Sequence, residues 1–559
     1  MADSSEHLRG HESPSEATEN AKEKKQDAPA PGPESPPAAA APTQYPPPMV
    51  FAVNMFALYI SIFCVALDNT IISTAIPQIT DQFQALDDVG WYGSAYTLTQ
   101  CAFILQFGKL YRLFNPKWVF LMSLFIFELG SLVCGVAPSS LALIFGVAGL
   151  FSGNLVIITY TSPLDKRPIW QSLISGMFGI GSVVGPLMGG AFTDNLTWRW
   201  CFYINLPLGG VTAAIIVFFL RLTPQKSPFK DRTLLQKFLM FDPLGFVLFL
   251  PSIICLFIAL QWGGTKYPWS DGRIIALFVV FGVALIAFLL LQWRLGEAAT
   301  IPPRIVTQRM IWSASWFAFF ISGAFFLFIY FLPIYFQALK GSTALRSGID
   351  NLPLILANVI VVIVSGFAVS RVGYINPFCL GSVVFASIGS GLLTTVSIDT
   401  NTVGYQILFG IGSGLGFQQP PSAPQAVLPF KDLPIGIAIT LFGRNFGSSL
   451  FVSVGNNILD SNLLSGLKAR AIPGVDPQAV LEAGATEFRS VVPASALPAV
   501  LDVYNKALQK TFQVGLIISC IAVIGAALIE WKSVKGKKAP PSSRSTENGA
   551  SEKAQNASS

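Results

Sequence analysis

The chain has 559 residues, of which 52% are hydrophobic and 12% are charged, and its mean hydropathy is +0.57. Because soluble chains carry about 25% charged residues, this composition excludes a protein built only of water-soluble globular domains. The net charge of +6 crowds into tails and short loops beside apolar stretches. Anionic lipid and membrane topology account for charge in such places, so we expect the lipid bilayer as a partner and no nucleic acid.

Residues 1–48 are polar and then rich in Pro and Ala, and we expect them to form a disordered cytoplasmic tail. Fourteen apolar segments follow, each near the length of about 20 residues that a helix needs to cross a bilayer. The sequence therefore predicts an all-α, polytopic membrane protein with about 14 transmembrane helices. We place them at residues 50–74, 91–111, 117–137, 139–160, 170–193, 200–220, 242–262, 274–294, 311–337, 351–371, 375–397, 403–426, 435–459 and 511–531.

The Lys and Arg residues of the short loops predict the orientation of the chain. They gather after the second, fourth, sixth, eighth and last apolar segments, whereas the loops on the opposite side are poor in them. The positive-inside rule then places both termini in the cytoplasm. The long loop 460–510 is predicted to be external, and residues 532–559 form a second disordered cytoplasmic tail.

The fifth apolar segment carries glycines four positions apart, at Gly181, Gly185 and Gly189. Positions four apart share one helical face, and a face of bare glycines lets a neighbouring membrane helix approach closely. Pro186 lies inside this segment, where it removes one backbone donor and bends the helix. After a polar turn, the run Trp198–Trp200 is of the kind found at the headgroup level of a bilayer.

Two motifs in this region resemble those of a known family. GSVVGPLMGG, which ends at Gly190, is similar to the antiporter motif of the major facilitator superfamily. WRWCFYINLPLGG, which follows it, is similar to the re-entry signature of the 14-span drug:proton antiporter branch, especially fungal toxin and multidrug efflux carriers. The alternative is a tightly packed helix pair without a transport role, and in both cases the glycines are packing positions.

The resemblance implies two six-helix bundles with two extra helices between them, and a substrate site at the midplane between the bundles. It divides the chain into an N-terminal bundle over 49–221, a cytoplasmic linker and the extra pair over 222–310, and a C-terminal bundle over 311–531. The external loop 460–510 then belongs to the C-terminal bundle.

Three ionisable residues lie inside predicted spans, where a charge is costly. Asp68 lies in LDNTIISTAIP, which resembles the first-helix motif of the branch. It can hold and release a proton, or it caps the helix end through Thr70 or Ser73. Glu128 is a second proton candidate or a neutral acid that only packs. Arg444 binds an anionic substrate group or pairs with a carboxylate, unless its side chain snorkels to the headgroups.

A loop between the second and third spans also matches a family motif, through Gly108, Lys109, Arg112 and Lys117. Cytoplasmic bases there can hold the cytoplasmic side closed by salt bridges and helix-end contacts, and the alternative is that they only set the topology. Tyr111 stands where the wider superfamily carries an Asp.

Polar and aromatic side chains inside the spans are candidates for lining a substrate cavity. Each polar one alone is more often an interhelical hydrogen bond, and each Phe more often packs or faces lipid. The polar candidates are Gln100, Asn205, Asn358, Gln418 and Gln419, and the aromatic ones are Phe317, Phe319, Phe320, Phe325, Phe326 and Phe328.

The fourth predicted span departs from the family pattern. After the stretch that ends at Gly146, the family carries an Arg and about two further helical turns, whereas this chain runs directly into Val147–Gly153. The family assigns that Arg to proton coupling or substrate relay. Either this carrier couples differently or the sequence carries a deletion, and the shortened run is still long enough to span.

Other chemical sites are few. The seven cysteines fall inside apolar segments without paired spacing, and the two histidines lie in the N-terminal tail, so we expect no metal site. No GxxxxGK[ST] loop is present, which argues against drive by ATP. We expect no cofactor, with a proton gradient as the energy source. Asn195 begins a glycosylation sequon in a tight external turn.

Together these inferences predict a secondary active efflux carrier and not an enzyme. We expect a monomer of the plasma membrane that exports a drug, toxin or secondary metabolite in exchange for protons and so confers drug resistance. One alternative is a vacuolar or siderophore-type carrier of the same fold. Another is a membrane sensor that does not transport.

Overall fold

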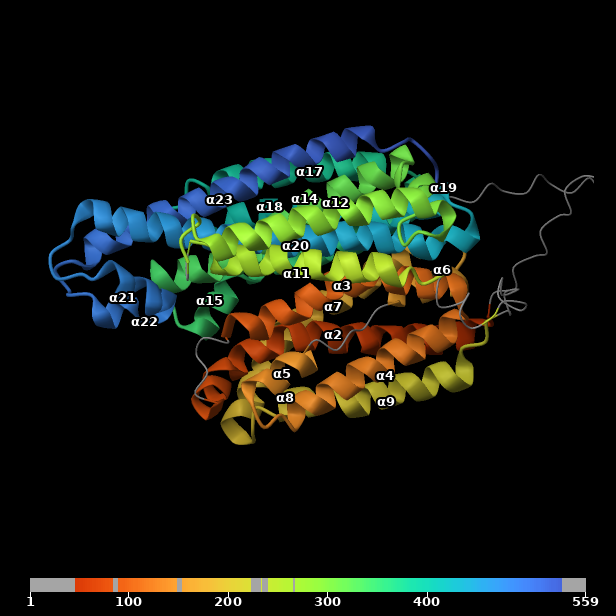
Figure 1. Ribbon diagram of the computed structural model, residues 1–559, viewed down its shortest axis with the longest axis horizontal. Coiled ribbons are helices and arrows are strands. Elements are labelled where there is room, and N and C mark those ends of the chain that lie inside the picture. The colour runs from red at the N-terminus through yellow and green to blue at the C-terminus, as the bar shows by residue number, and fades with distance from the viewer. Residues whose placement is uncertain are drawn as a thin grey trace, which may run out of the picture. The chain divides into compact units, whose positions relative to one another are not determined.

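Figure 1 shows the computed structural model of the chain, which describes residues 46–83, 89–147, 153–222, 233, 240–264 and 267–534. In these residues the elements are helical, and β pairing is limited to one isolated bridge between Gly263 and Tyr267. The predicted all-α class is therefore confirmed. The two predicted tails, up to residue 45 and from residue 535, lie outside the described residues, as does most of the predicted linker.

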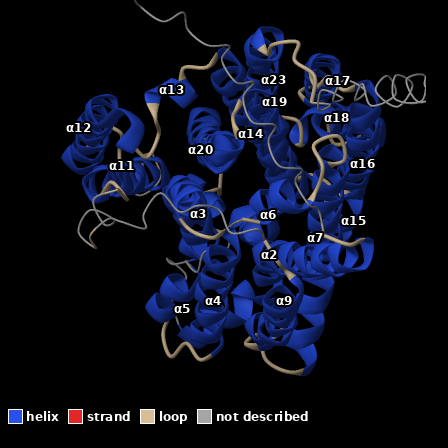
Figure 2. Cartoon of the chain, turned by 90° about the vertical axis from the view of Figure 1, so that its right-hand side faces the viewer, coloured by secondary structure: helices blue, strands red, loops and turns tan. Residues whose placement is uncertain are grey.

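The N-terminal half is the group of helices from α2 to α9. They are α2 (Pro48–Phe83), α3 (Val89–Leu113), α4 (Pro116–Gly135), α5 (Ser140–Val147), α6 (Asn154–Thr161), α7 (Arg167–Asn195), α8 (Trp200–Tyr203) and α9 (Asn205–Phe219). α2 packs along α7 and α9, and α4 packs along α5 and α9. α2 therefore lies at the centre of this half (Figure 2).

An extra helix pair follows, formed by α11 (Pro243–Trp262) and α12 (Gly272–Leu295), which pack against each other. The C-terminal half comes next. It consists of α13 (Pro303–Val306), α14 (Arg309–Ala338), α15 (Ala344–Asp350), α16 (Leu352–Val372), α17 (Asn376–Leu393), α18 (Val403–Phe417), α19 (Ala423–Val427), α20 (Leu433–Arg470), α21 (Pro477–Glu482), α22 (Gly484–Val491) and α23 (Leu497–Leu528). Within this half, the long helix α14 packs against α20 and α23.

Eleven helices of the described residues are long and apolar enough to cross a membrane, which confirms a polytopic membrane protein. Three of the fourteen predicted spans are not among them. The span predicted at 91–111 lies within α3, and the one at 139–160 is divided between α5 and α6. The one at 403–426 stops as an α-helix at Phe417, shortly before a Pro pair. The count of fourteen and the domain boundaries stay predictions.

The glycine face of α7 packs against α2. A Cβ atom at Gly181 would lie 2.5 Å from the Cβ of Ala66, and one at Gly185 would overlap the hydroxyl of Thr70. The two backbones can approach this closely only because these positions carry no side chain. At Gly190 a Cβ atom would meet nothing within 4 Å, so that glycine is not needed for the contact. α7 continues through Pro186, whose side chain lies outside the described part of the chain.

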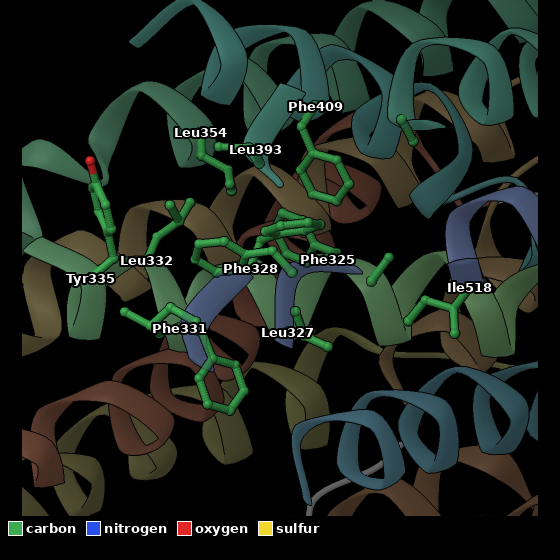
Figure 3. Packing of buried hydrophobic residues seen from close by; sticks show 14 of the residues in the cluster. Phe325, Leu327, Phe328, Phe331, Leu332, Tyr335, Leu354, Leu393, Phe409 and Ile518 are labelled. Carbon is green, nitrogen blue, oxygen red and sulfur yellow. The ribbon is translucent and has the colours of Figure 1, made fainter. Parts of the chain in front are cut away.

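Phenylalanines of α14 form the core of the C-terminal half (Figure 3). Phe317, Phe325 and Phe328 are buried, and the ring of Phe328 lies 4.6 Å from that of Phe409, centroid to centroid. A Cβ atom at Gly515 of α23 would lie 2.6 Å from the Phe328 ring. These aromatic side chains therefore pack the helices of the C-terminal half together.

Helices fill most of residues 460–510, the segment that is predicted to be an external loop. α20 continues to Arg470, α21 and α22 follow, and α23 begins at Leu497. The extension of α20 carries Leu459, Leu463 and Leu467 on one face, and all three are buried. Its apolar stripe therefore continues beyond the length needed to cross a bilayer.

Candidate functional site

Asp68 of α2, Ser131 of α4 and Asn205 of α9 meet inside the N-terminal half. The fully buried amide of Asn205 donates to Asp68 Oδ1 at 2.5 Å and to Ser131 Oγ at 3.2 Å. Asp68 thus finds its donor on another helix. The hydroxyl of Thr70 donates to carbonyls of its own helix, and the side chain of Ser73 lies outside the described part of the chain.

Glu128 lies one turn from Ser131 on α4 and contacts α9 one turn beyond Asn205. A Cβ atom at Gly209 would overlap Glu128 Oε1, so a glycine is needed to admit this carboxyl group. Neither of its oxygens has a hydrogen-bond partner among the residues that the structure describes. Glu128 is also close enough to Asp68 for the two acids to interact electrostatically.

The carboxyl cluster, formed by Asp68, Glu128, Ser131 and Asn205, lies inside the N-terminal half. Asn205 begins α9, just after the Trp residues of the predicted external headgroup level. Glu128 lies deeper, about 10 Å from the predicted external end of α4 and about 18 Å from its cytoplasmic end at 1.5 Å per residue. α4 and α9 lie on the side of α2 that faces away from α14 and α20 (Figures 1 and 2). Sequence reasoning missed Ser131, although it is three residues from Glu128 and so shares its helix face.

Polar side chains also join the two halves. The amide of Asn445 on α20 donates to Gln100 of α3 at 3.1 Å, and the hydroxyl of Ser175 on α7 donates to Gln418, just beyond α18, at 2.6 Å. Gln100 and Gln418 therefore lie at the interface between the halves, as the cavity prediction requires.

The other three polar cavity candidates lie elsewhere, and Asn205 belongs to the carboxyl cluster. Asn358 of α16 donates to Ser413 of α18 at 2.9 Å, and Gln419 donates to Ser365 of α16 at 3.3 Å. Both bonds stay within the C-terminal half, so these amides act as interhelical links, which is the alternative that the sequence left open.

Arg444 lies on α20 next to the interface residue Asn445. The carbon of its guanidinium group is 5.3 Å from the centre of the Phe417 ring, within the range of a cation–π contact. Among the described residues no carboxylate lies within 4.0 Å of this group. The structure therefore does not give Arg444 the carboxylate partner that the sequence allowed.

Charged residues gather where α3 meets the start of α20, on the side that is predicted to face the cytoplasm, and we call them the cytoplasmic cluster: Lys109, Arg112, Glu297, Arg304 and Asp432. The fully buried Asp432 pairs with Arg112 at 3.3 Å and with Arg304 at 2.9 Å. Arg304 also pairs with Glu297 at 2.7 Å, and the ammonium of Lys109 donates to the carbonyl of Ala298 at 2.6 Å. Side chains of both halves and of the segment after α12 therefore meet here.

The two remaining residues of the loop motif, Gly108 and Lys117, contact different helices. A Cβ atom at Gly108 would overlap the Cβ of Ala438, so α3 and α20 touch at that glycine. Lys117 instead donates to the carbonyl of Val217 within the N-terminal half. Sequence reasoning missed Asp432, for which the available signal was an acid placed directly before a predicted span.

The fourth predicted span is interrupted at the point where the sequence departs from the family. α5 is described to Val147 and α6 begins at Asn154, and residues 148–152 lie outside the described part of the chain. The described residue between the two helices, Gly153, is not helical, so the expected single helix is interrupted there. Gly153 has φ +124°, and a Cβ atom there would overlap the hydroxyl of Tyr111. The two departures, the unusual Tyr111 and the shortened span, are therefore neighbours in space.

Asn195 of the predicted sequon is the last residue of α7 and is exposed. Its amide donates to the carbonyl of Ala191 at 2.9 Å. The described residues hold no group of three or more His, Cys, Asp or Glu side chains that could bind a metal ion.

Comparisons with known proteins cover most of the chain. The sequence model of the Major Facilitator Superfamily matches residues 58–452. The MFS-type efflux pump MFS1 of Trichophyton rubrum is 52% identical over 500 residues, which cover 88% of this chain and 93% of the relative. The efflux pump aflT of Aspergillus parasiticus is 50% identical over 491 residues, which cover 86% of this chain and 95% of the relative.

A solved structure supports the same fold at low sequence identity. The proton:xylose symporter XylE, bound to 6-bromo-6-deoxy-D-glucose, aligns with a TM-score of 0.56 at 11% identity. The alignment covers 87% of this chain and 98% of that one. At this identity the likeness concerns the fold alone.

Proposed function

Because the chain belongs to the major facilitator superfamily, we propose that a proton gradient drives it. It is a multi-pass membrane carrier and not an enzyme, and it is an efflux transporter like its relatives named efflux pumps. The names of those relatives support export of hydrophobic or amphipathic small molecules. We further propose that it works as a monomer in the plasma membrane, without a cofactor.

The carboxyl cluster is the observation that supports proton drive. Glu128 is enclosed by α4 and α9 and has no hydrogen-bond donor among the described residues, and an unpaired buried carboxylate is costly. Protonation removes that charge, so this group favours proton uptake. Asp68 and Asn205 lie between Glu128 and the predicted external end, which gives protons a short route from outside.

The proposed cycle uses the two halves separately. Protons enter at Asp68 and are held at Asp68 or Glu128, inside the N-terminal half. The exported molecule binds between the halves, where Gln100 and Gln418 lie. Loss of the proton toward the cytoplasm then accompanies the change in the packing of the two halves that exposes the substrate site to the other side of the membrane.

Efflux of a fluorescent amphipathic dye from cells that express the full chain tests this proposal. We expect a protonophore to abolish efflux and Asp68→Asn to reduce it at least tenfold, because the amide cannot carry a proton. Asp399→Asn, which changes an exposed carboxylate outside the cluster, is the matched control and is expected to be neutral. Efflux that ignores both the protonophore and Asp68→Asn would overturn proton drive. No efflux from well-expressed Asp399→Asn and parent proteins would favour a membrane sensor.

A further inference from the structure

The buried and partly buried cations of the described residues reach oxygen atoms, with one exception. The ammonium or guanidinium groups that do so contact backbone carbonyls or carboxylates, and they belong to Lys109, Arg112, Lys117, Arg167, Arg199 and Arg489. Arg444 is the exception, because its guanidinium contacts the ring of Phe417 and no described carboxylate. An aromatic face offsets only part of the cost of removing a cation from water.

The position of Arg444 along α20 argues against the simplest explanation, which is that its side chain snorkels to the headgroups. α20 begins at Leu433 beside the cytoplasmic cluster, and at 1.5 Å per residue Arg444 lies about 16 Å further along the helix. This is about half of the hydrocarbon thickness of a bilayer, which is roughly 30 Å. Counted from the start of α20, Arg444 therefore lies about half a hydrocarbon thickness along the helix, and its guanidinium packs on Phe417.

Arg444 also borders the interface between the halves. It is followed by Asn445, which bonds Gln100 across the interface, and its aromatic neighbour Phe417 is followed by Gln418, which bonds Ser175 across it. Arg444 thus lies between two bonds that join the halves. It is partly accessible, unlike Asn205 of the carboxyl cluster.

From this placement we propose that Arg444 binds an anionic group of the exported molecule, which is therefore an amphipathic organic acid. The guanidinium group presents paired N–H donors that match a carboxylate bidentately. Phe417, and beyond it Phe325 at a ring distance of 5.2 Å, offers an aromatic wall for the apolar body. The proposal rests on efflux as the function and adds the class of substrate.

The test measures binding to the purified full chain in nanodiscs, with empty nanodiscs as the background. The probes are 1-pyrenebutyrate and 1-pyrenebutanol, which share a ring and an alkyl arm and differ in the carboxylate. We expect the unaltered chain to bind the acid more tightly than the alcohol. Arg444→Gln should weaken binding of the acid roughly ten- to hundredfold, as expected for loss of hydrogen bonds to a charged group, and leave the alcohol unchanged.

Two further variants make the result decisive. Arg294→Gln removes an exposed cation of α12 and is expected to change nothing. Arg444→Lys keeps the charge but loses the bidentate fork, so it should retain only part of the preference for the acid. If Arg444→Gln does not fold, Arg444→Lys replaces it in the test. An unchanged preference of Arg444→Lys for the acid over the alcohol would then overturn the proposal.

Equal affinity of the unaltered chain for the acid and the alcohol would also overturn the proposal. An Arg444→Gln variant that loses affinity for both probes to the same extent would overturn it too. Because binding at equilibrium needs no gradient, the outcome is separate from that of the efflux experiment. A chain that binds the acid through Arg444 but ignores the protonophore would keep this site and lose proton drive.

Discussion

Glu128 illustrates how strongly one residue depends on a partner from another helix. Its carboxyl group occupies the space that any side chain at position 209 would need. Nothing described donates a hydrogen bond to it, so α9 accommodates the shape of Glu128 and does not stabilise its charge. A group held in this way is either a proton site or an acid that only fills space.

Glu128→Gln separates these two roles, because the amide keeps the shape and cannot take up or release a proton. We expect it to lower dye movement driven by an imposed pH gradient at least tenfold in proteoliposomes, while binding of the dye is retained. The exposed Asp399→Asn serves again as the control. If Glu128→Gln transports as well as the parent protein, Glu128 only packs.

The sequence predicted which acids are unusual but not what they contact. Asp68 and Glu128 stand out because a carboxyl group in an apolar span is rare. Ser131 and Asn205 are ordinary polar residues in membrane helices, and their role depends on α4 and α9 lying against α2. Such contacts join residues distant in the chain, and spacing along one helix does not reveal them. Arg444 was likewise found from the sequence, whereas its contact with Phe417 was not.

At the scale of helices, α7 shows a pattern that the sequence predicted well. Glycines four apart indicated close packing, and Gly181 and Gly185 do lie against α2. The sequence did not predict the length of α20. A span of 435–459 follows from the bilayer thickness, whereas the helix is longer. Leu459, Leu463 and Leu467 continue the apolar face of α20 beyond that length, so the helix ends only at Arg470.

The glycine face predicts a sharp difference between two substitutions in α7. Gly185→Ala places a methyl group against Thr70 and should lower the free energy of unfolding by about 1–3 kcal/mol, as overpacking does. Gly190→Ala meets nothing within 4 Å and should be neutral or slightly stabilising, because Ala favours helix more than Gly does. Thermal unfolding of the purified proteins followed by fluorescence measures both. Equal melting temperatures would show that α2 and α7 are not packed as tightly as described.

At the scale of the whole molecule, the contacts between the halves gather toward the predicted cytoplasmic ends of the helices. Gly108 lies against α20, and Gly366 of α16 lies against Ser172 of α7. The cytoplasmic cluster adds ion pairs at the same level, with the fully buried Asp432 between Arg112 and Arg304. The segment that follows α12 contributes Glu297 and the carbonyl of Ala298, so the end of the extra helix pair joins the contacts at this level.

Asp432→Asn should therefore open the cytoplasmic side more often. The amide cannot form the two ion pairs, and hydrogen bonds to charged groups contribute about 1.5–3 kcal/mol each, so the open population should rise at least tenfold. A cysteine introduced at Ser175, in a chain with Cys255→Ser and Cys520→Ser, reports this opening through its labelling rate with a membrane-impermeant maleimide. Lys431→Gln, which removes the exposed neighbouring charge, is the control and should leave the rate unchanged. A labelling rate that Asp432→Asn does not raise would mean that close packing at Gly108 and Gly366, and not the ion pairs, keeps the cytoplasmic side closed.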